Sequence, residues 1–263
     1  MFGVHFGVAF HAPVLSHGAA SVPGPRARGR QLVQLASGRR RGPVTQLIAP
    51  WHIGKQTSPF VSLEYVEANA GLEAVAGPQC RSGTATLVAV LGGRVLFEHA
   101  NGIRGEINAG GCAWMPASQV AWRGESGMEQ PLRVFQLGIS PAGKQQTAPA
   151  VSDEVGQHYP EEAGSVRVIL GRFGRTQSPL RSVLAGMNLF HVSLKDNEVW
   201  RYFAPDAHNV IWLAVERGGL ELTEGERVYW EQMGVFDESA GLIEMQADGD
   251  TSFLLGSARK DPR

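Results

Sequence analysis

Histidine side chains are the commonest protein ligands of catalytic iron and zinc, so their spacing is the first chemical feature of this sequence. The chain has 263 residues and eight histidines, and no two histidines lie within five residues of each other. Local pairs such as His-x-His, and the His-Glu-x-x-His motif of metalloproteases, are therefore absent. A metal site would need ligands that converge from distant strands, and we predict none.

Motifs for phosphate binding and nucleophilic catalysis are equally weak. Gly138 to Gln145 approximates a P-loop, but Gln145 occupies the position where Ser or Thr would hold Mg²⁺, and Pro149 follows where a helix should begin. No Gly-x-Ser-x-Gly elbow occurs. Cys80 lies beside Arg81, whose charge could lower the thiol pKa, yet no histidine is near in sequence to act as a base. We interpret Cys80 as an ordinary loop residue.

The composition is that of a globular protein. Hydrophobic residues make up 43% and charged residues 19%, and the formal net charge is −1. The balanced charge argues against direct nucleic-acid binding, and no apolar run is long enough to span a membrane. Two cysteines, Cys80 and Cys112, cannot form a disulfide framework. We therefore expect a reducing compartment, the cytoplasm. We also expect a monomer.

The positive charge gathers near the N-terminus. Seven basic residues precede the first acidic residue, Glu64. We predict that residues 1–30 form a disordered basic extension. A transit peptide and a nucleic-acid-binding arm stay open as alternatives.

The elements that would position any site are short β-strands. Thr86–Leu91 and Arg94–Glu98 flank Gly92-Gly93, which predicts a hairpin. Val210–Val215 and Leu220–Leu222 flank Gly218-Gly219 in the same way, about 125 residues later, which suggests two copies of one β-domain. Further strands are expected at Leu132–Leu137, Val166–Leu170, Leu189–Leu194, Arg227–Tyr229 and Ser252–Leu255. Prolines between the halves indicate a linker, and the pattern as a whole favours an all-β protein.

Several segments resemble the pirin family. Ser58-Pro-Phe60 with Leu63-Glu-Tyr65 resembles the Asp-Pro-Phe…Leu-Asp-Tyr segment of pirins, and Gly110–Ala117, with Trp114-Met115, resembles their Gly-Asp-Val-Gln-Trp-Met-Thr-Ala. Ser140-Pro141 and the residues after it resemble the start of the pirin linker, and Phe253–Gly256 resembles the closing strand. The resemblance runs from about Gln31 to the C-terminus.

The resemblance implies two tandem cupin domains, which are jelly-roll β-barrels. We expect an N-terminal pirin-like cupin at 31–140, a linker at 141–164 and a C-terminal cupin at 165–263. In pirins the N-terminal barrel holds one iron on three histidines and one glutamate.

A gapless alignment from Gly83 to Glu125 places Gln79, Arg81, Arg123 and Glu125 at those four positions. Arginine cannot coordinate a metal, because its guanidinium stays protonated. We therefore expect no iron or other cofactor. The same four residues are predicted to form either a structural Arg–Glu bridge or a pocket for an anionic ligand.

Three functions of different classes follow. The favoured one is a non-catalytic pirin-like protein that binds a small, anionic ligand or a protein partner in a regulatory role. The second is an iron-dependent quercetin 2,3-dioxygenase-like oxygenase, an activity that some pirins have. The third is a metal-free enzyme with Glu125 as a base beside Arg81 or Arg123.

Overall fold

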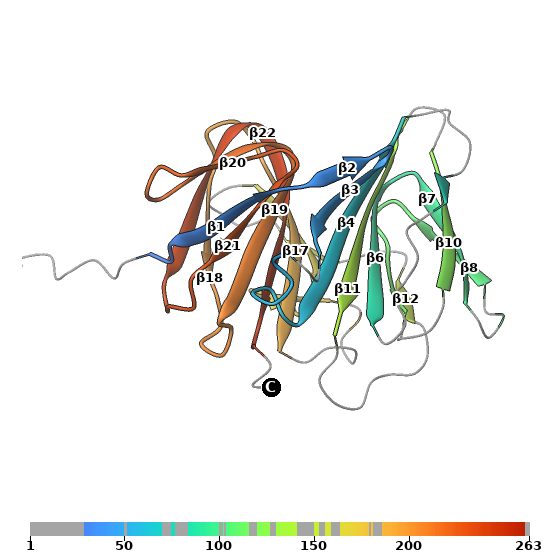
Figure 1. Ribbon diagram of the computed structural model, residues 1–263, viewed down its shortest axis with the longest axis horizontal. Helices are drawn as coiled ribbons and strands as arrows, with labels where there is room; N and C mark the ends of the chain where they lie inside the picture. The colour runs from blue at the N-terminus through green and yellow to red at the C-terminus, as the bar shows by residue number, and fades with distance from the viewer. Residues whose placement is uncertain are drawn as a thin grey trace, which may run out of the picture.

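The computed structural model shows an all-β protein built from two barrels side by side, which confirms the predicted fold class (Figure 1). The structure describes residues 29–49, 52–69, 75–76, 84–99, 102, 104–115, 120–126, 130–140, 150–152, 156–158, 164–178, 180 and 186–260. Within these ranges there is no helix, and hence no helix that could cross a membrane.

Two sheets form the N-terminal barrel. The larger has the order β12 (Ala150–Ser152), β9 (Cys112–Met115), β6 (Ala85–Gly92), β11 (Leu132–Ile139), β4 (Phe60–Ala68), β3 (Val44–Ile48) and β2 (Arg39–Arg41). The smaller has the order β5 (Val75–Ala76), β10 (Val120–Glu125), β7 (Arg94–His99) and β8 (Arg104–Asn108). All pairings are antiparallel. The predicted hairpin of Thr86–Leu91 and Arg94–Glu98 is wrong: β6 and β7 follow each other across Gly93, whose φ is 70°, but they pair with other strands in different sheets.

The C-terminal barrel is one large curled sheet. Its order is β1 (Leu32–Ser37), β21 (Gln232–Phe236), β19 (Val210–Leu222), β22 (Leu242–Ala258), β17 (Met187–Leu194), β14 (Ser165–Leu170) and β13 (Gly156–His158). The strand β18 (Val199–Phe203) pairs with β22, and β20 (Arg227–Tyr229) pairs with β19. A small ribbon consists of β15 (Arg172–Phe173) and β16 (Thr176–Gln177).

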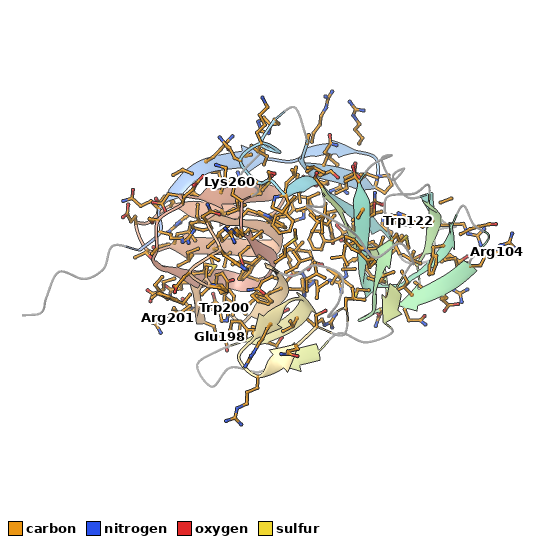
Figure 2. All side chains as sticks on the ribbon, turned by 90° about the horizontal axis from the view of Figure 1, so that it is seen from below. Arg104, Trp122, Glu198, Trp200, Arg201 and Lys260 are labelled. Atoms are coloured by element: carbon orange, nitrogen blue, oxygen red, sulfur yellow. The ribbon has the colours of Figure 1, made fainter. Side chains whose placement is uncertain are left out.

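Three clusters of buried apolar side chains stabilise the sheets of the two barrels. One fills the N-terminal barrel, one fills the C-terminal barrel, and the third lies between the large sheets of the two domains. Figure 2 shows side chains packed continuously from one barrel to the other. Phe60 and Trp212 meet edge-to-face across the domain boundary, with ring centroids 5.3 Å apart.

These three apolar clusters explain why the sequence contains uninterrupted apolar runs. In β19, Trp212 and Ala214 face the other domain, whereas Leu213 and Val215 fill their own barrel. In β6, Leu87 and Val88 divide between the two clusters in the same way. A strand that is buried on both faces needs apolar residues at successive positions rather than in alternation.

The second predicted hairpin is also wrong. Residues 210–222 form a single strand, β19, and Gly218-Gly219 lies inside it rather than at a turn. The pairing of β19 with β22 shifts register on both sides of Arg217. Gly218 has a φ of 76°, and a Cβ there would lie 2.7 Å from the carbonyl oxygen of Asp250. The glycines therefore permit a bulge and a close approach to β22.

The predicted domain boundaries are also crossed at both ends of the N-terminal domain. The strand β1 was expected in that domain, but it pairs with β21 of the C-terminal sheet, as Figure 1 shows. Arg30, which we assigned to the extension, is buried and donates hydrogen bonds to the carbonyl oxygens of His208 and Asp237. The predicted linker supplies β12 to one domain and β13 to the other. Residues 1–28 lie outside the described residues.

Candidate functional site

Two of the four predicted site residues are described, and they form an ion pair. Arg123 Nη2 lies 3.1 Å from Glu125 Oε1, and Arg94 Nη2 lies 2.7 Å from Glu125 Oε2. The side chain of Arg123 is 58% exposed. Gln79 and Arg81 lie outside the described residues, so the prediction that all four line one pocket stays a prediction.

Trp122, which precedes Arg123 on β10, points into the barrel. It is 5% exposed and belongs to the apolar cluster inside the N-terminal barrel. Its indole Nε1 donates a hydrogen bond to Gln136, whose amide nitrogen lies 3.5 Å from Glu64 Oε2. Because side chains alternate along a strand, Arg123 and Glu125 lie on the opposite face of β10. Arg123 is thus turned away from the barrel interior, where the alignment had placed it.

The polar groups found in this interior do not suit iron. Glu64 supplies one carboxylate and Gln136 one amide, and an amide is not a ligand that catalytic iron favours. Among the residues that the structure describes, no three His, Cys, Asp or Glu side chains are grouped so that they could hold a metal. The alignment assigns two further ligand positions to Gln79 and Arg81, in a segment outside that part of the chain.

The most elaborate polar site lies between the two domains and centres on Glu216. Its side chain is 1% exposed. Oε1 accepts hydrogen bonds from Arg133 Nη1 at 2.9 Å and from the Tyr65 hydroxyl at 3.3 Å. Oε2 lies 2.8 Å from His191 Nε2 and 2.9 Å from the Ser252 hydroxyl. Two of these partners come from each domain, so one carboxylate ties the barrels together.

The strand geometry explains how a carboxylate reaches this position. Glu216 follows the apolar run of β19 at the bulge, where Val215 still pairs with Phe253 but Arg217 pairs with Ser252. Two successive residues of β19 therefore face one residue of β22, which re-aims their side chains. As a result, Glu216 and Arg217 both lie at the domain boundary.

The environment of Glu216 favours its charged form. Burial acts to raise the pKa of the Glu216 carboxyl, but the hydrogen bond and charge of His191, the charge of Arg133 and the Ser252 hydrogen bond lower it to about 2. The pKa of the Tyr65 hydroxyl is raised instead, by burial and by the negative charge of Glu216. The carboxylate is thus fixed in place and satisfied by donors.

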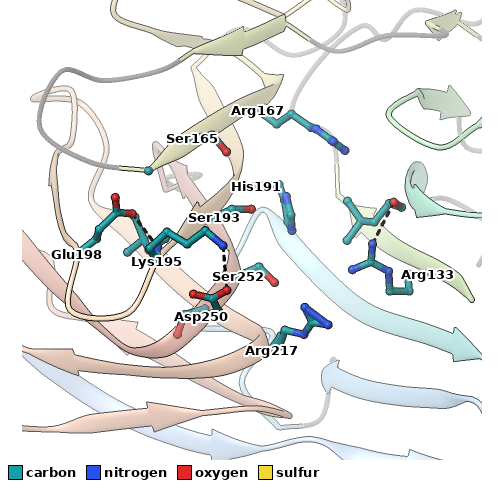
Figure 3. A pocket seen from close by; sticks show the side chains of 14 residues that line it. Arg133, Ser165, Arg167, His191, Ser193, Lys195, Glu198, Arg217, Asp250 and Ser252 are labelled. Atoms are coloured by element: carbon teal, nitrogen blue, oxygen red, sulfur yellow. Dashed lines mark hydrogen bonds and ion pairs between the residues drawn. The ribbon is translucent and has the colours of Figure 1, made fainter. Parts of the chain in front are cut away.

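A cleft of about 490 Å³ opens beside this carboxylate (Figure 3). Its basic lining residues come from both domains: Arg133 from β11, and Arg167, His191, Lys195 and Arg217 from the C-terminal barrel. Two carboxylates, Glu198 and Asp250, also line it. The cleft is therefore concave and rich in cations, which suits an anion rather than a metal.

Comparison with known proteins supports the two-barrel fold. No family model matches the chain. A Pseudomonas aeruginosa protein provisionally named as a quercetin 2,3-dioxygenase is 27% identical over 231 residues, which are 81% of this chain and 79% of that protein. A crystal structure of quercetin 2,3-dioxygenase from Acinetobacter baumannii superposes with a TM-score of 0.76 at 16% identity, covering 88% of each chain. The Escherichia coli pirin YhhW, in complex with nickel(II), superposes with a TM-score of 0.63 at 17% identity, covering 87% of this chain and 99% of YhhW. The chain therefore has the fold of two tandem cupin barrels that these structures share.

In this two-barrel fold the residues around Glu216 were missed by the sequence analysis. The partners of Glu216 lie 25 to 151 positions away along the chain. No motif joins residues so far apart, and only the arrangement of five strands, β4, β11, β17, β19 and β22, brings them together. The available signal was a single carboxylate at the end of the apolar run 210–215, where a charge needs buried partners.

Proposed function

We propose that this pirin-type bicupin acts by binding a small anionic ligand, in a regulatory role, and not by iron-dependent catalysis. The supporting observation is the interior of the N-terminal barrel. There, the indole of Trp122 donates a hydrogen bond to the buried amide of Gln136, and neither side chain is a ligand that catalytic iron favours. The exposed position of Arg123 also argues that the barrel does not rebuild a metal site from its ligand positions.

An iron-dependent oxygenase of the quercetin 2,3-dioxygenase type is the second candidate. It is favoured by the provisional name of the Pseudomonas aeruginosa relative, which aligns over 81% of this chain. Such a reaction requires a bound metal with an open position for substrate or dioxygen. The described interior offers one carboxylate and one amide, so the binding function has the stronger support.

Flavonol turnover separates these two functions. The full chain would be incubated with ferrous iron and, separately, with nickel(II), and the loss of quercetin absorbance would be followed under air. The Pseudomonas aeruginosa relative serves as a parallel enzyme, and metal without protein gives the background rate. We expect a rate equal to that background. Turnover that depends on both the chain and the metal would overturn the binding function and establish the oxygenase.

A further inference from the structure

The floor of the interdomain cleft is a row of polar side chains that crosses four neighbouring strands. Ser165 on β14 pairs with Ser193 on β17, Ser193 pairs with Ser252 on β22, and Ser252 pairs with Arg217 on β19. Directly paired residues of adjacent antiparallel strands point to the same face, with Cβ atoms roughly 5 Å apart. Three hydroxyls and a guanidinium therefore stand side by side where the cleft opens.

A second row adds two more cationic or polar groups on the same face. Arg167 of β14 pairs with His191 of β17, and both line the cleft. Arg133 reaches in from the other domain, where one of its nitrogens lies 2.9 Å from Glu216 and another 3.4 Å from the carbonyl oxygen of Leu91. Figure 3 shows these side chains around a common space.

The acidic residues of the cleft are already engaged. Asp250 lies 2.9 Å from the ammonium group of Lys195, and Glu198 accepts a hydrogen bond from the backbone nitrogen of Lys195. Glu216 holds four donors behind the cleft wall. An arriving anion would therefore meet Arg217 and the serine hydroxyls rather than a bare carboxylate.

Arg217 keeps its donors available. Its charge acts on Asp250 and Lys195, but within the described part of the chain the guanidinium forms no hydrogen bond. The hydroxyls of Ser165 and Ser193 are likewise without a hydrogen-bond partner among the described residues. Guanidinium groups bind carboxylates and phosphates through two parallel hydrogen bonds, and hydroxyls complete such sites.

We propose that the interdomain cleft binds a small organic oxyanion, either a carboxylate or a phosphate ester, with Arg217 as its main charged contact. The proposal rests on the proposed ligand-binding function and gives its ligand a chemical class and a place. A volume of about 490 Å³ lies in the range of roughly 300–1,000 Å³ that is usual for small-molecule sites. Arg133 and Glu216 connect this site to both domains, so bound anion would stabilise their contact.

Titration calorimetry on the full chain tests the proposal. The protein would first pass over a chelating resin, and inorganic phosphate and citrate would be titrated at constant ionic strength. We expect at least one of the two to bind, and Arg217→Gln to weaken its affinity by about tenfold. Ser193→Ala should weaken it less, because a neutral hydroxyl bond contributes less than a charged one.

Arg227→Gln is the matched control. Arg227 lies in the same domain but on the exposed strand β20, where it pairs with Glu221 at 2.8 Å. Its replacement removes the same charge and should leave the affinity unchanged. The proposal is overturned if neither anion binds, or if Arg227→Gln and Arg217→Gln weaken binding equally. Binding of phosphate alone or of citrate alone supports it and identifies the source. Flavonol turnover would defeat the proposed function without affecting this result, so the two failures are distinguishable.

Discussion

Replacing Glu216 by Gln should destabilise the protein by an amount that depends on pH. The pKa of Glu216 is lowered from an ordinary value of 4.5 to about 2 by its four donors. At about 1.4 kcal/mol per pH unit, this difference corresponds to roughly 3 kcal/mol of stability at neutral pH. Glutamine keeps the shape of the side chain but loses the charge, and its amide nitrogen faces donors. We therefore expect the free energy of unfolding at pH 7 to fall by about 3 kcal/mol.

The sign of the pH dependence follows from the direction of the shift. A carboxyl whose pKa is lowered by folding stabilises the protein above the unfolded value, here 4.5, and loses that contribution as the pH falls toward 2. The gap between wild type and Glu216→Gln should therefore shrink to about half by pH 3.

Urea unfolding followed by tryptophan fluorescence, at pH 7 and at steps down to pH 3, measures this gap. Glu221→Gln is the control, because Glu221 forms an exposed pair with Arg227 that should contribute less than about 1 kcal/mol. A Glu216→Gln variant within about 0.5 kcal/mol of wild type at pH 7 would refute the reasoning. A loss that stays constant down to pH 3 would also refute it, since the effect would then be one of packing rather than charge.

Three further predictions concern packing and reactivity. Trp122→Phe removes the indole donor and leaves the buried oxygen of Gln136 without it, so the free energy of unfolding should fall by about 1–3 kcal/mol in urea titrations. Gly256→Ala should cost at least about 1–3 kcal/mol in the same assay, because a Cβ at Gly256 would overlap the ring of Trp212; an unchanged midpoint would contradict this packing. Burial raises the pKa of the Cys112 thiol to about 12, so in a Cys80→Ser background Ellman's reagent should label no thiol at pH 8 until urea is added.

The sequence predicted the strands better than their partners. Arg227–Tyr229 was predicted with the bounds of β20, and Thr86–Leu91 and Arg94–Glu98 fall within β6 and β7, but these two strands lie in different sheets and form no hairpin. Gly218-Gly219 looked identical to Gly92-Gly93 in sequence but lies within a continuous strand. A Gly-Gly pair can lie between two strands or inside one. At Gly218-Gly219 the pairing with β22 keeps the strand continuous, and local sequence does not reveal such a distant partner.

The candidate site was harder to predict for the same reason. Arg123 and Glu125 were placed by aligning linear positions, and the actual register turns both to the face opposite Trp122. Glu216 and Arg217 reach the domain boundary together only because a bulge shifts the pairing of β19. Neither residue belongs to a sequence motif, and their surroundings are built from five strands that lie far apart in the chain.

Metal stoichiometry tests the central claim most directly. The full chain would be purified after growth with added iron and analysed by elemental mass spectrometry, with the Pseudomonas aeruginosa relative prepared in parallel. The account predicts iron, nickel and zinc contents far below one atom per chain for this protein. About one iron per chain would contradict it, because the N-terminal barrel would then assemble a metal site, and the oxygenase would become the leading function.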